Sequence, residues 1–178
     1  GTDILSVGSV GCNMTCLHCQ NANISQCNFS DTAQLREISS DEITGKAVSL
    51  HMPSIAYTYN EPAISFEFVR DTAEKAHQEG LFNVLVTNGY IQPAPLEELI
   101  PFTDALNVDL KAFNDRFYQE ICGARLSHVL KALEIIAASG TYFEITFLAV
   151  TGLNDDPGEF GRMVGYIAEQ FGPDQVLH

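Results

Sequence analysis

Residues 4–19 of this chain read ILSVGSVGCNMTCLHC, and this stretch sets the interpretation of the rest of the sequence. Its start, residues 4–8, is a short run rich in aliphatic side chains, which is typical of a β-strand. Three cysteines follow in the spacing C-x3-C-x2-C: Cys12, Cys16 and Cys19. Thiolates this close together on one loop can wrap a single metal cluster. We therefore expect a strand that leads directly into a metal-binding loop.

The number of cysteines in the loop indicates which metal group it holds. A cluster of four irons needs four ligands, and no fourth cysteine follows at a matching interval. Three protein ligands leave one iron open to a small molecule, much as a catalytic zinc keeps one open position. Zinc with His18 as the fourth ligand is an alternative, although adjacent residues such as His18 and Cys19 rarely bind one tetrahedral ion together.

The other two cysteines, Cys27 and Cys122, are isolated in the sequence, and we expect them to be small apolar fillers. Five cysteines, three of them within eight residues, make a poor disulfide framework. A reducing, cytoplasmic environment is therefore the natural setting for this chain.

Composition points to one globular domain over residues 1–178, with 46% apolar and 18% charged residues. Nine basic residues against 23 acidic ones give a formal charge of −14, which argues against broad contact with nucleic acid or an anionic membrane. No apolar run approaches the roughly 20 residues of a membrane span. The chain starts at Gly1 without an initiator Met, so we expect a piece of a longer protein.

Strand and helix patterns alternate along the chain. Strand patterns, short and rich in β-branched or aromatic residues, occupy residues 4–8, 54–59, 82–87, 105–110, 142–150 and 175–178. Helices are predicted after the capping box of Ser39 and Glu42, from Pro62 to Gly80, from Ser127 to Gly140, and from Asp156 to Gly172, with shorter ones at 95–102 and 114–121. This alternation predicts an α/β fold with parallel strands and right-handed crossovers, a partial (β/α)6 barrel.

Polar residues follow the predicted strands, where βα barrels gather their chemistry. They are the cysteine loop, Asn60 and Glu61, Thr87 to Gly89, Asp109 and Lys111, residues 151–155, and His178. Because the carboxyl ends of parallel strands meet at one edge of the sheet, we expect these side chains to converge there.

The cysteine loop after a first strand resembles the radical S-adenosylmethionine (SAM) superfamily. Further segments are similar to its branch called the AmmeMemoRadiSam system radical SAM enzyme, itself similar to pyruvate formate-lyase activating enzymes. These segments are SIAYTYNEP at 54–62, VTNGY at 86–90, NVDLKA at 107–112, CGARL at 122–126 and GLND at 152–155.

The resemblance implies an enzyme with a four-iron, four-sulfur (4Fe-4S) cluster on Cys12, Cys16 and Cys19, whose open iron chelates SAM. Reductive cleavage of SAM then gives a 5′-deoxyadenosyl radical that abstracts a hydrogen atom. It further implies a low-potential electron donor of the flavodoxin or ferredoxin type. Implied partners are a protein substrate, carrying a glycine in the activating enzymes, or AMMECR- and Memo-type proteins.

The resemblance also assigns roles around SAM. Glu61 matches the glutamate of a Gly-Gly-Glu-Pro type motif and would accept hydrogen bonds from the SAM ammonium, although Tyr59 and Asn60 replace the two glycines. Asp109 and Lys111 share one face of a strand and match an Asp-Leu-Lys that contacts SAM. The alternatives are a helix-terminal carboxylate for Glu61 and a structural ion pair for the other two.

Four further positions are assigned in the same way. Thr87 and Asn88 match a Thr-Asn-Gly near the methionine part of SAM, with Val86 where the activating enzymes have Asp. His178 matches a histidine near the ribose, and His18 stands where an aromatic residue packs by the adenine. A plain tight turn at Asn88 and a plain chain end at His178 are the alternatives.

Two other functions remain open at this stage. An iron–sulfur electron carrier without SAM chemistry explains the cysteines but not Glu61, Asp109 and Lys111. A zinc-stabilised binding module explains the cysteines through a different metal and predicts a colourless protein.

Overall fold

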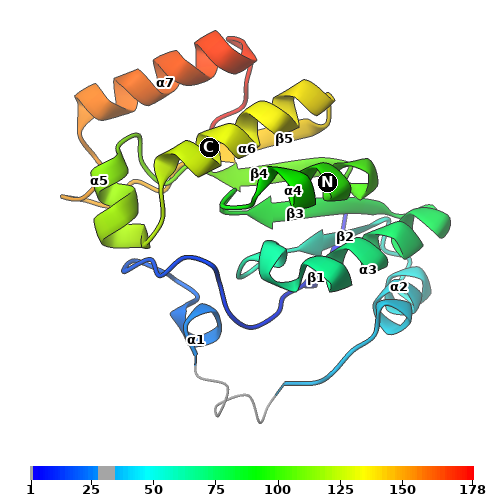
Figure 1. The fold of residues 1–178 in the computed structure, drawn as a ribbon. Helices are drawn as coiled ribbons and strands as arrows, with labels where there is room; N and C mark the ends of the chain where they lie inside the picture. The colour runs from blue at the N-terminus through cyan, green and yellow to red at the C-terminus, as the bar shows by residue number, and fades with distance from the viewer. Residues whose placement is uncertain (1, 28–34) are drawn as a thin grey trace.

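The computed structural model describes residues 2–27 and 35–178, which form a parallel five-stranded sheet with its strands in chain order (Figure 1). Each strand pairs only with its sequence neighbours, and every pairing is parallel. The strands are β1 (Leu5–Val7), β2 (Ser54–Tyr57), β3 (Phe82–Thr87), β4 (Ala105–Asp109) and β5 (Tyr142–Thr146). The order β1-β2-β3-β4-β5 is what repeated right-handed crossovers of one kind produce.

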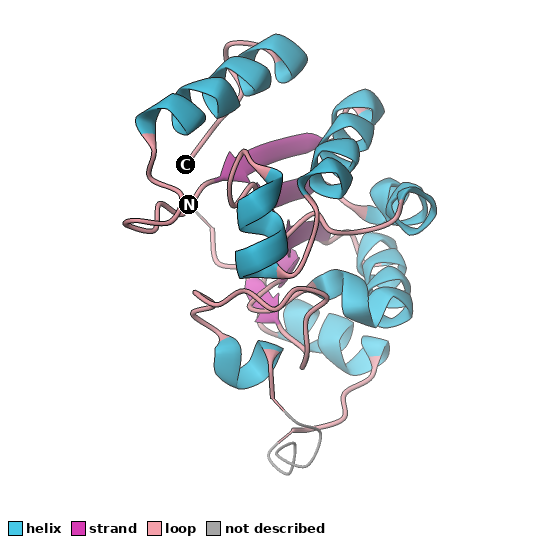
Figure 2. Cartoon of the chain, turned by 60° about the vertical axis from the view of Figure 1, so that its left-hand side comes forward, coloured by secondary structure: helices cyan, strands magenta, loops and turns pink. Residues whose placement is uncertain are grey.

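Helices connect the strands. The longer ones are α2 (Ser40–Ser49), α3 (Phe66–Gln78), α4 (Pro93–Leu99), α6 (Leu126–Ser139) and α7 (Pro157–Phe171). The short ones are α1 (Ala22–Ser25), η2 (Pro62–Ser65), η3 (Ile100–Phe102), α5 (Asp115–Phe117) and η4 (Tyr118–Cys122), the last a single turn of π-helix. Figure 2 shows the helices grouped beside the strands, with α7 set apart near the C-terminus. No helix in the described ranges is long and apolar enough to cross a membrane.

The predicted α/β fold with parallel strands is confirmed, with shorter strands than expected. The stretch at 175–178 contributes one isolated parallel bridge, Ile145 to Leu177, instead of a full strand. The second strand ends at Tyr57, because Tyr59 has a φ of 73°, which no strand residue adopts.

The helix signals of the sequence act largely as predicted. Ser39 Oγ accepts a hydrogen bond from Glu42 N, and Glu42 Oε2 accepts one from Ser39 N, so the capping box is formed. Asp156 caps α7 by accepting from the backbone of Glu159. The third predicted helix starts at Leu126 instead of Ser127, with Arg125 before it and no side-chain cap.

One hydrophobic core joins the sheet to its helices. The central strands contribute Ile55, Leu85, Leu106 and Val108, all buried, and α6 contributes one apolar stripe. The stripe of α6 consists of Leu126, Val129, Ala132, Leu133 and Ile136. Its spacing of three and four residues places these side chains on one helix face. The polar residues gather beside this core, at the carboxyl ends of the strands.

Candidate active site

A cavity of about 360 Å³ opens at the carboxyl edge of the sheet. It is lined by Cys12, Met14, Cys16, His18, Cys19, Gln20, Asn21, Ser25, Thr58, Tyr59, Asn60, Val86, Thr87, Asn88, Asp109, Lys111, Thr146 and Leu148. The structure therefore brings together all of the residues predicted to bind the cluster or SAM except Glu61 and His178, while residues 151–155, also expected at this edge, do not line the cavity. A volume of this size is in the range of small-molecule sites.

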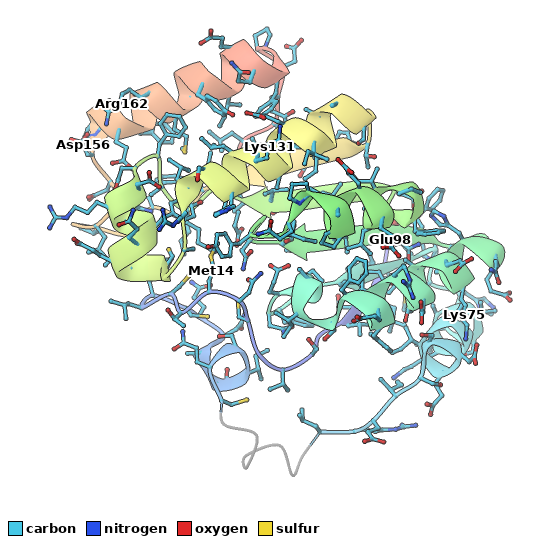
Figure 3. All side chains as sticks on the ribbon, viewed as in Figure 1. Met14, Lys75, Glu98, Lys131, Asp156 and Arg162 are labelled. Carbon is cyan, nitrogen blue, oxygen red and sulfur yellow. The ribbon has the colours of Figure 1, made fainter. Side chains whose placement is uncertain are left out.

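The cysteine loop, residues 9–21, packs against the end of η4. Thr15 N donates to the carbonyl of Cys122 at 2.9 Å, and Leu17 N donates to that of Ile121 at 2.9 Å. Met14 of this loop, labelled in Figure 3, is 2% exposed and belongs to the hydrophobic core. The loop is thus anchored to a segment more than a hundred residues away in sequence.

The sulfur atoms of the loop have polar neighbours. Cys12 Sγ accepts from Met14 N at 3.4 Å and from Asn88 Nδ2 at 3.5 Å. Cys19 Sγ lies 3.1 Å from the hydroxyl of Ser25. Donors aimed at a sulfur favour its thiolate form and tune the potential of a cluster that it holds.

Cys16 has a second cysteine beside it. Cys122, fully buried and predicted to be an apolar filler, makes a side-chain hydrogen bond with Cys16. This hydrogen bond is the main reason why the pKa of Cys16 is lowered to about 7 and the pKa of Cys122 is raised. Burial, in contrast, raises the pKa of Cys12. Cys16 is therefore held closer to its thiolate form near neutral pH than Cys12 is.

Glu61 lies beneath the cavity and is 1% exposed. Its Oε1 accepts from Ala63 N at 2.9 Å and from Thr87 Oγ1 at 2.8 Å, and its Oε2 accepts from Asn88 N at 2.8 Å. Burial raises its pKa despite these donors. The contact with Ala63 N is that of a carboxylate at the start of a helix, η2, which was the alternative role for Glu61. The other two hydrogen bonds hold the turn after β3 in place.

Asp109 and Lys111 form an ion pair on the cavity wall, with Nζ 2.8 Å from Oδ2. Burial lowers the pKa of Lys111, but the charge of Asp109 and their hydrogen bond outweigh it, so the net shift is upward. Tyr118 further fixes this corner by accepting from Lys111 N at 3.0 Å. The pair presents both a cation and a carboxylate to the cavity.

The turn after β3 contacts the cysteine loop directly. Asn88 Oδ1 accepts from Tyr90 N at 2.8 Å, which is the tight turn expected at this position. Its Nδ2 donates to Asn13 Oδ1 at 2.9 Å. One side chain therefore holds its own turn and the cysteine loop together.

The two predicted histidines differ in placement. His18 lines the cavity, and its ring lies 5.7 Å from that of Phe117 at 49°. Burial lowers its pKa, and its Nδ1 is buried with no hydrogen-bond partner in the described chain. His178 lies away from the cavity, where its Nε2 is 2.7 Å from Glu144 Oε2. The predicted role of His178 at a ribose has no support from this placement and stays a prediction.

Several cavity residues were absent from the sequence-based set. Gln20, Asn21 and Tyr59 lie on the loops beside predicted residues, and Thr146 ends β5. The register pairs Thr146 with Asp109, so both side chains face the same side. The alternation of side chains along a strand could have predicted that Thr146 faces the cavity. The positions of the other residues depend on the conformation of their loops.

The sequence profile of the radical SAM superfamily matches residues 6–164 of this chain. The chain belongs to the radical SAM superfamily. It is 38% identical over 177 residues to the uncharacterized protein MJ0808 of Methanocaldococcus jannaschii, covering 99% of this chain and 52% of that protein. It thus spans about half of that relative's length. It is 26% identical over 166 residues to the pyruvate formate-lyase 1-activating enzyme of Escherichia coli, covering 88% of this chain and 68% of that enzyme.

Solved structures share the radical SAM fold. A domain of a pyruvate-formate lyase-activating enzyme from Bacteroides vulgatus aligns with a TM-score of 0.61 at 20% identity, over 68% of this chain and 74% of that chain. Streptococcus suis SuiB bound to S-adenosylmethionine aligns with a TM-score of 0.71 at 11% identity, over 94% of this chain and 38% of that chain. At these identities the likeness concerns the fold alone.

The residues of this radical SAM chain fit the cofactors that the superfamily implies. All three loop cysteines line one cavity, with donors to two of their sulfurs and a partnerless Nδ1 of His18 beside them. A cluster takes one thiolate on each iron, so three thiolates on one loop are a donor set that fits an iron–sulfur cluster.

Proposed function

We propose that this chain binds a 4Fe-4S cluster on Cys12, Cys16 and Cys19, binds SAM in the adjoining cavity, and generates a radical from it. The observation that carries the proposal is the placement of the three cysteines and the Asp109–Lys111 pair in the walls of one cavity. A plain electron carrier has no need of a cavity with a half-buried ion pair beside its cluster. The chemistry that the cluster supplies when bound is one-electron reduction of the SAM sulfonium, giving methionine and a 5′-deoxyadenosyl radical.

The chain's own residues bind and orient the small molecule. SAM carries an ammonium, a carboxylate and an adenosine, so it needs partners of both charges. Lys111 and Asp109 offer a cation and a carboxylate 2.8 Å apart. His18, which lines the cavity, offers its ring to stack on a base. Glu61 acts from below by holding Thr87 and Asn88 against the cavity.

The proposed partners follow from the same chemistry. Reduction of a sulfonium requires a potential near the low end of the −700 to +450 mV range of iron–sulfur clusters, so we assign a flavodoxin- or ferredoxin-type donor. A protein substrate is proposed because the similar Escherichia coli protein is named an activating enzyme of another enzyme. AMMECR- and Memo-type proteins are the alternative partners that the resemblance implies.

The test is 5′-deoxyadenosine formation by the anaerobically reconstituted chain, reduced with dithionite and supplied with SAM. Wild type and Cys27→Ser are expected to form deoxyadenosine, because Cys27 does not line the cavity. Cys16→Ala is expected to form at least about 100-fold less, in line with loss of a group that holds the reacting cofactor. A brown protein that forms none indicates an electron carrier, and a colourless protein with stoichiometric zinc contradicts the proposal.

A further inference from the structure

A strained turn lies directly after β2, at the rim of the cavity. Asn60 N donates to the carbonyl of Thr58 at 3.0 Å, and Tyr59 between them has a φ of 73°. A hydrogen bond between residues two apart around a positive φ is a γ-turn of the rare, strained kind. Residues other than glycine adopt such backbone only where surrounding contacts enforce it.

The side chain of Asn60 binds one flank of the cysteine loop. Its Oδ1 accepts from Ser9 N at 3.1 Å, and its Nδ2 donates to Ser9 Oγ at 2.9 Å and to the Gly11 carbonyl at 2.7 Å. Both hydrogens of the amide are thus used within the protein. Gly11 directly precedes Cys12, so these bonds fix the backbone that carries the first loop cysteine.

The carbonyl of Tyr59 binds the other flank of the same loop. Asn21 Nδ2 donates to it at 2.6 Å, two residues after Cys19. The Tyr59 ring lies over Gly8, where an added Cβ would be 3.0 Å from ring atom Cδ2. The reversal of the chain at Tyr59 therefore directs two consecutive residues to the two ends of one loop.

We propose that the Tyr59–Asn60 turn is a clasp that holds the cysteine loop in its cluster-binding shape, and that Asn60 is a positioning residue for the cluster. Its amide hydrogens are already donated within the chain, so Asn60 acts through Ser9 and Gly11 and makes no donor contact with SAM. This inference rests on the proposed function, because it presumes that the loop holds a cluster. The clasp explains why a strained turn is kept at Tyr59 and Asn60, where the Gly-Gly-Glu-Pro type motif has two glycines.

The test compares Asn60→Ala, Asn60→Asp and the control Asn23→Ala in the reconstituted chain. Asn60→Ala removes all three contacts, while Asn60→Asp keeps the size and the acceptor for Ser9 but sets a carboxylate oxygen against the Gly11 carbonyl. Asn23 is an exposed asparagine in α1, on the segment that follows the loop. The readouts are the rate of iron release to a chelator, the Kd for SAM in cluster-loaded protein, and backbone amide exchange over residues 9–21.

Both Asn60 variants are expected to release iron about tenfold faster than wild type and Asn23→Ala, with a SAM Kd within twofold. Unchanged iron release overturns the clasp. A tenfold weaker SAM Kd with unchanged release instead makes Asn60 a direct SAM contact.

Amide exchange separates this inference from the proposed function. If wild type holds no iron, the proposed function fails. The clasp is then judged by exchange, which is expected to be about tenfold faster at Ser9 in Asn60→Ala than in wild type. Equal exchange rates contradict it.

Discussion

At the residue scale, the site depends on polar side chains whose bonds run to the protein itself. Glu61 is the clearest case, since all three of its hydrogen bonds go to the chain. Lys111 is held by Asp109, and Asn88 holds both its own turn and Asn13. A site in which such bonds are made before a ligand arrives needs little reorganisation on binding.

Glu61→Gln tests the burial of that carboxylate. Because burial raises the pKa of Glu61 in the folded chain, its contribution to stability is fully present below the unfolded value, about 4.3, and is lost as pH rises through the folded pKa. Glutamine does not titrate. The free energy of unfolding of the variant is therefore expected to rise relative to wild type as the pH increases above about 4.

Denaturant unfolding at several pH values checks this prediction. Glu97→Gln is the matched control, because Glu97 is an exposed carboxylate on α4. If the free energy of unfolding of Glu61→Gln relative to wild type stays constant as the pH increases above about 4, or falls, the pKa of Glu61 is not raised.

At the element scale, the cysteine loop is shaped by the turn of π-helix against which it packs. Two backbone bonds join residues 15–17 to residues 121–122, and Gly123 ends η4 with a φ of 65°. Single π-turns are uncommon and often occur at functional sites. Here the turn brings the Cys122 thiol to Cys16 and the carbonyl of Cys122 to Thr15.

Gly123→Ala tests this close approach. An added Cβ would collide with Thr15 Oγ1, on a backbone that L side chains rarely adopt. The variant is expected to lose about 1–3 kcal/mol of stability. The double variant with Thr15→Ala is expected to recover the part of the loss that is due to the collision.

Gly165→Ala provides the control for this element. Gly165 lies in α7 with nothing within 4 Å of an added Cβ, so alanine there is expected to stabilise by about 0.5–1 kcal/mol. Thermal unfolding of the three variants measures the difference. If Gly123→Ala is as well tolerated as Gly165→Ala, the loop does not depend on this contact.

At the scale of the whole molecule, the parallel sheet gathers distant segments at one edge. Its register aligns Val7, Tyr57 and Leu85 near the ends of their strands, and Asp109 with Thr146 farther along the sheet. The cavity wall therefore draws on loops after all five strands. A ligand that contacts several of these loops links the sheet into one cooperative unit.

SAM is accordingly expected to stabilise the whole cluster-loaded chain. A ligand at 100 times its Kd adds about 2.7 kcal/mol, which for a chain of this size is a Tm increase of about 5–11 °C. Removing the iron, or replacing Cys16 by Ser, is expected to abolish most of the increase. Thermal scans with and without SAM measure it, and an equal increase in Cys16→Ser protein would show that SAM binds without the cluster.

The sequence by itself determined the fold class and the position of the cysteine loop in this radical SAM protein, because both depend on local patterns. The spacing of Cys12, Cys16 and Cys19 is visible within one loop, and strand and helix periodicities follow from neighbouring residues. The sequence also predicted that Asp109 and Lys111 lie near the cysteine loop, because parallel strands place their carboxyl ends at one edge of the sheet.

Only the tertiary structure decided what each polar side chain faces. The Glu61 side chain lies beneath the cavity and accepts a hydrogen bond from Thr87. Asn60 makes hydrogen bonds to Ser9 and Gly11, and Cys122 makes one with Cys16. These partners lie tens of residues or more from one another in sequence. The direction of the chain at Tyr59 follows from a positive φ that tertiary contacts impose against the local preference of tyrosine. Contacts that override local preference cannot be read from local sequence.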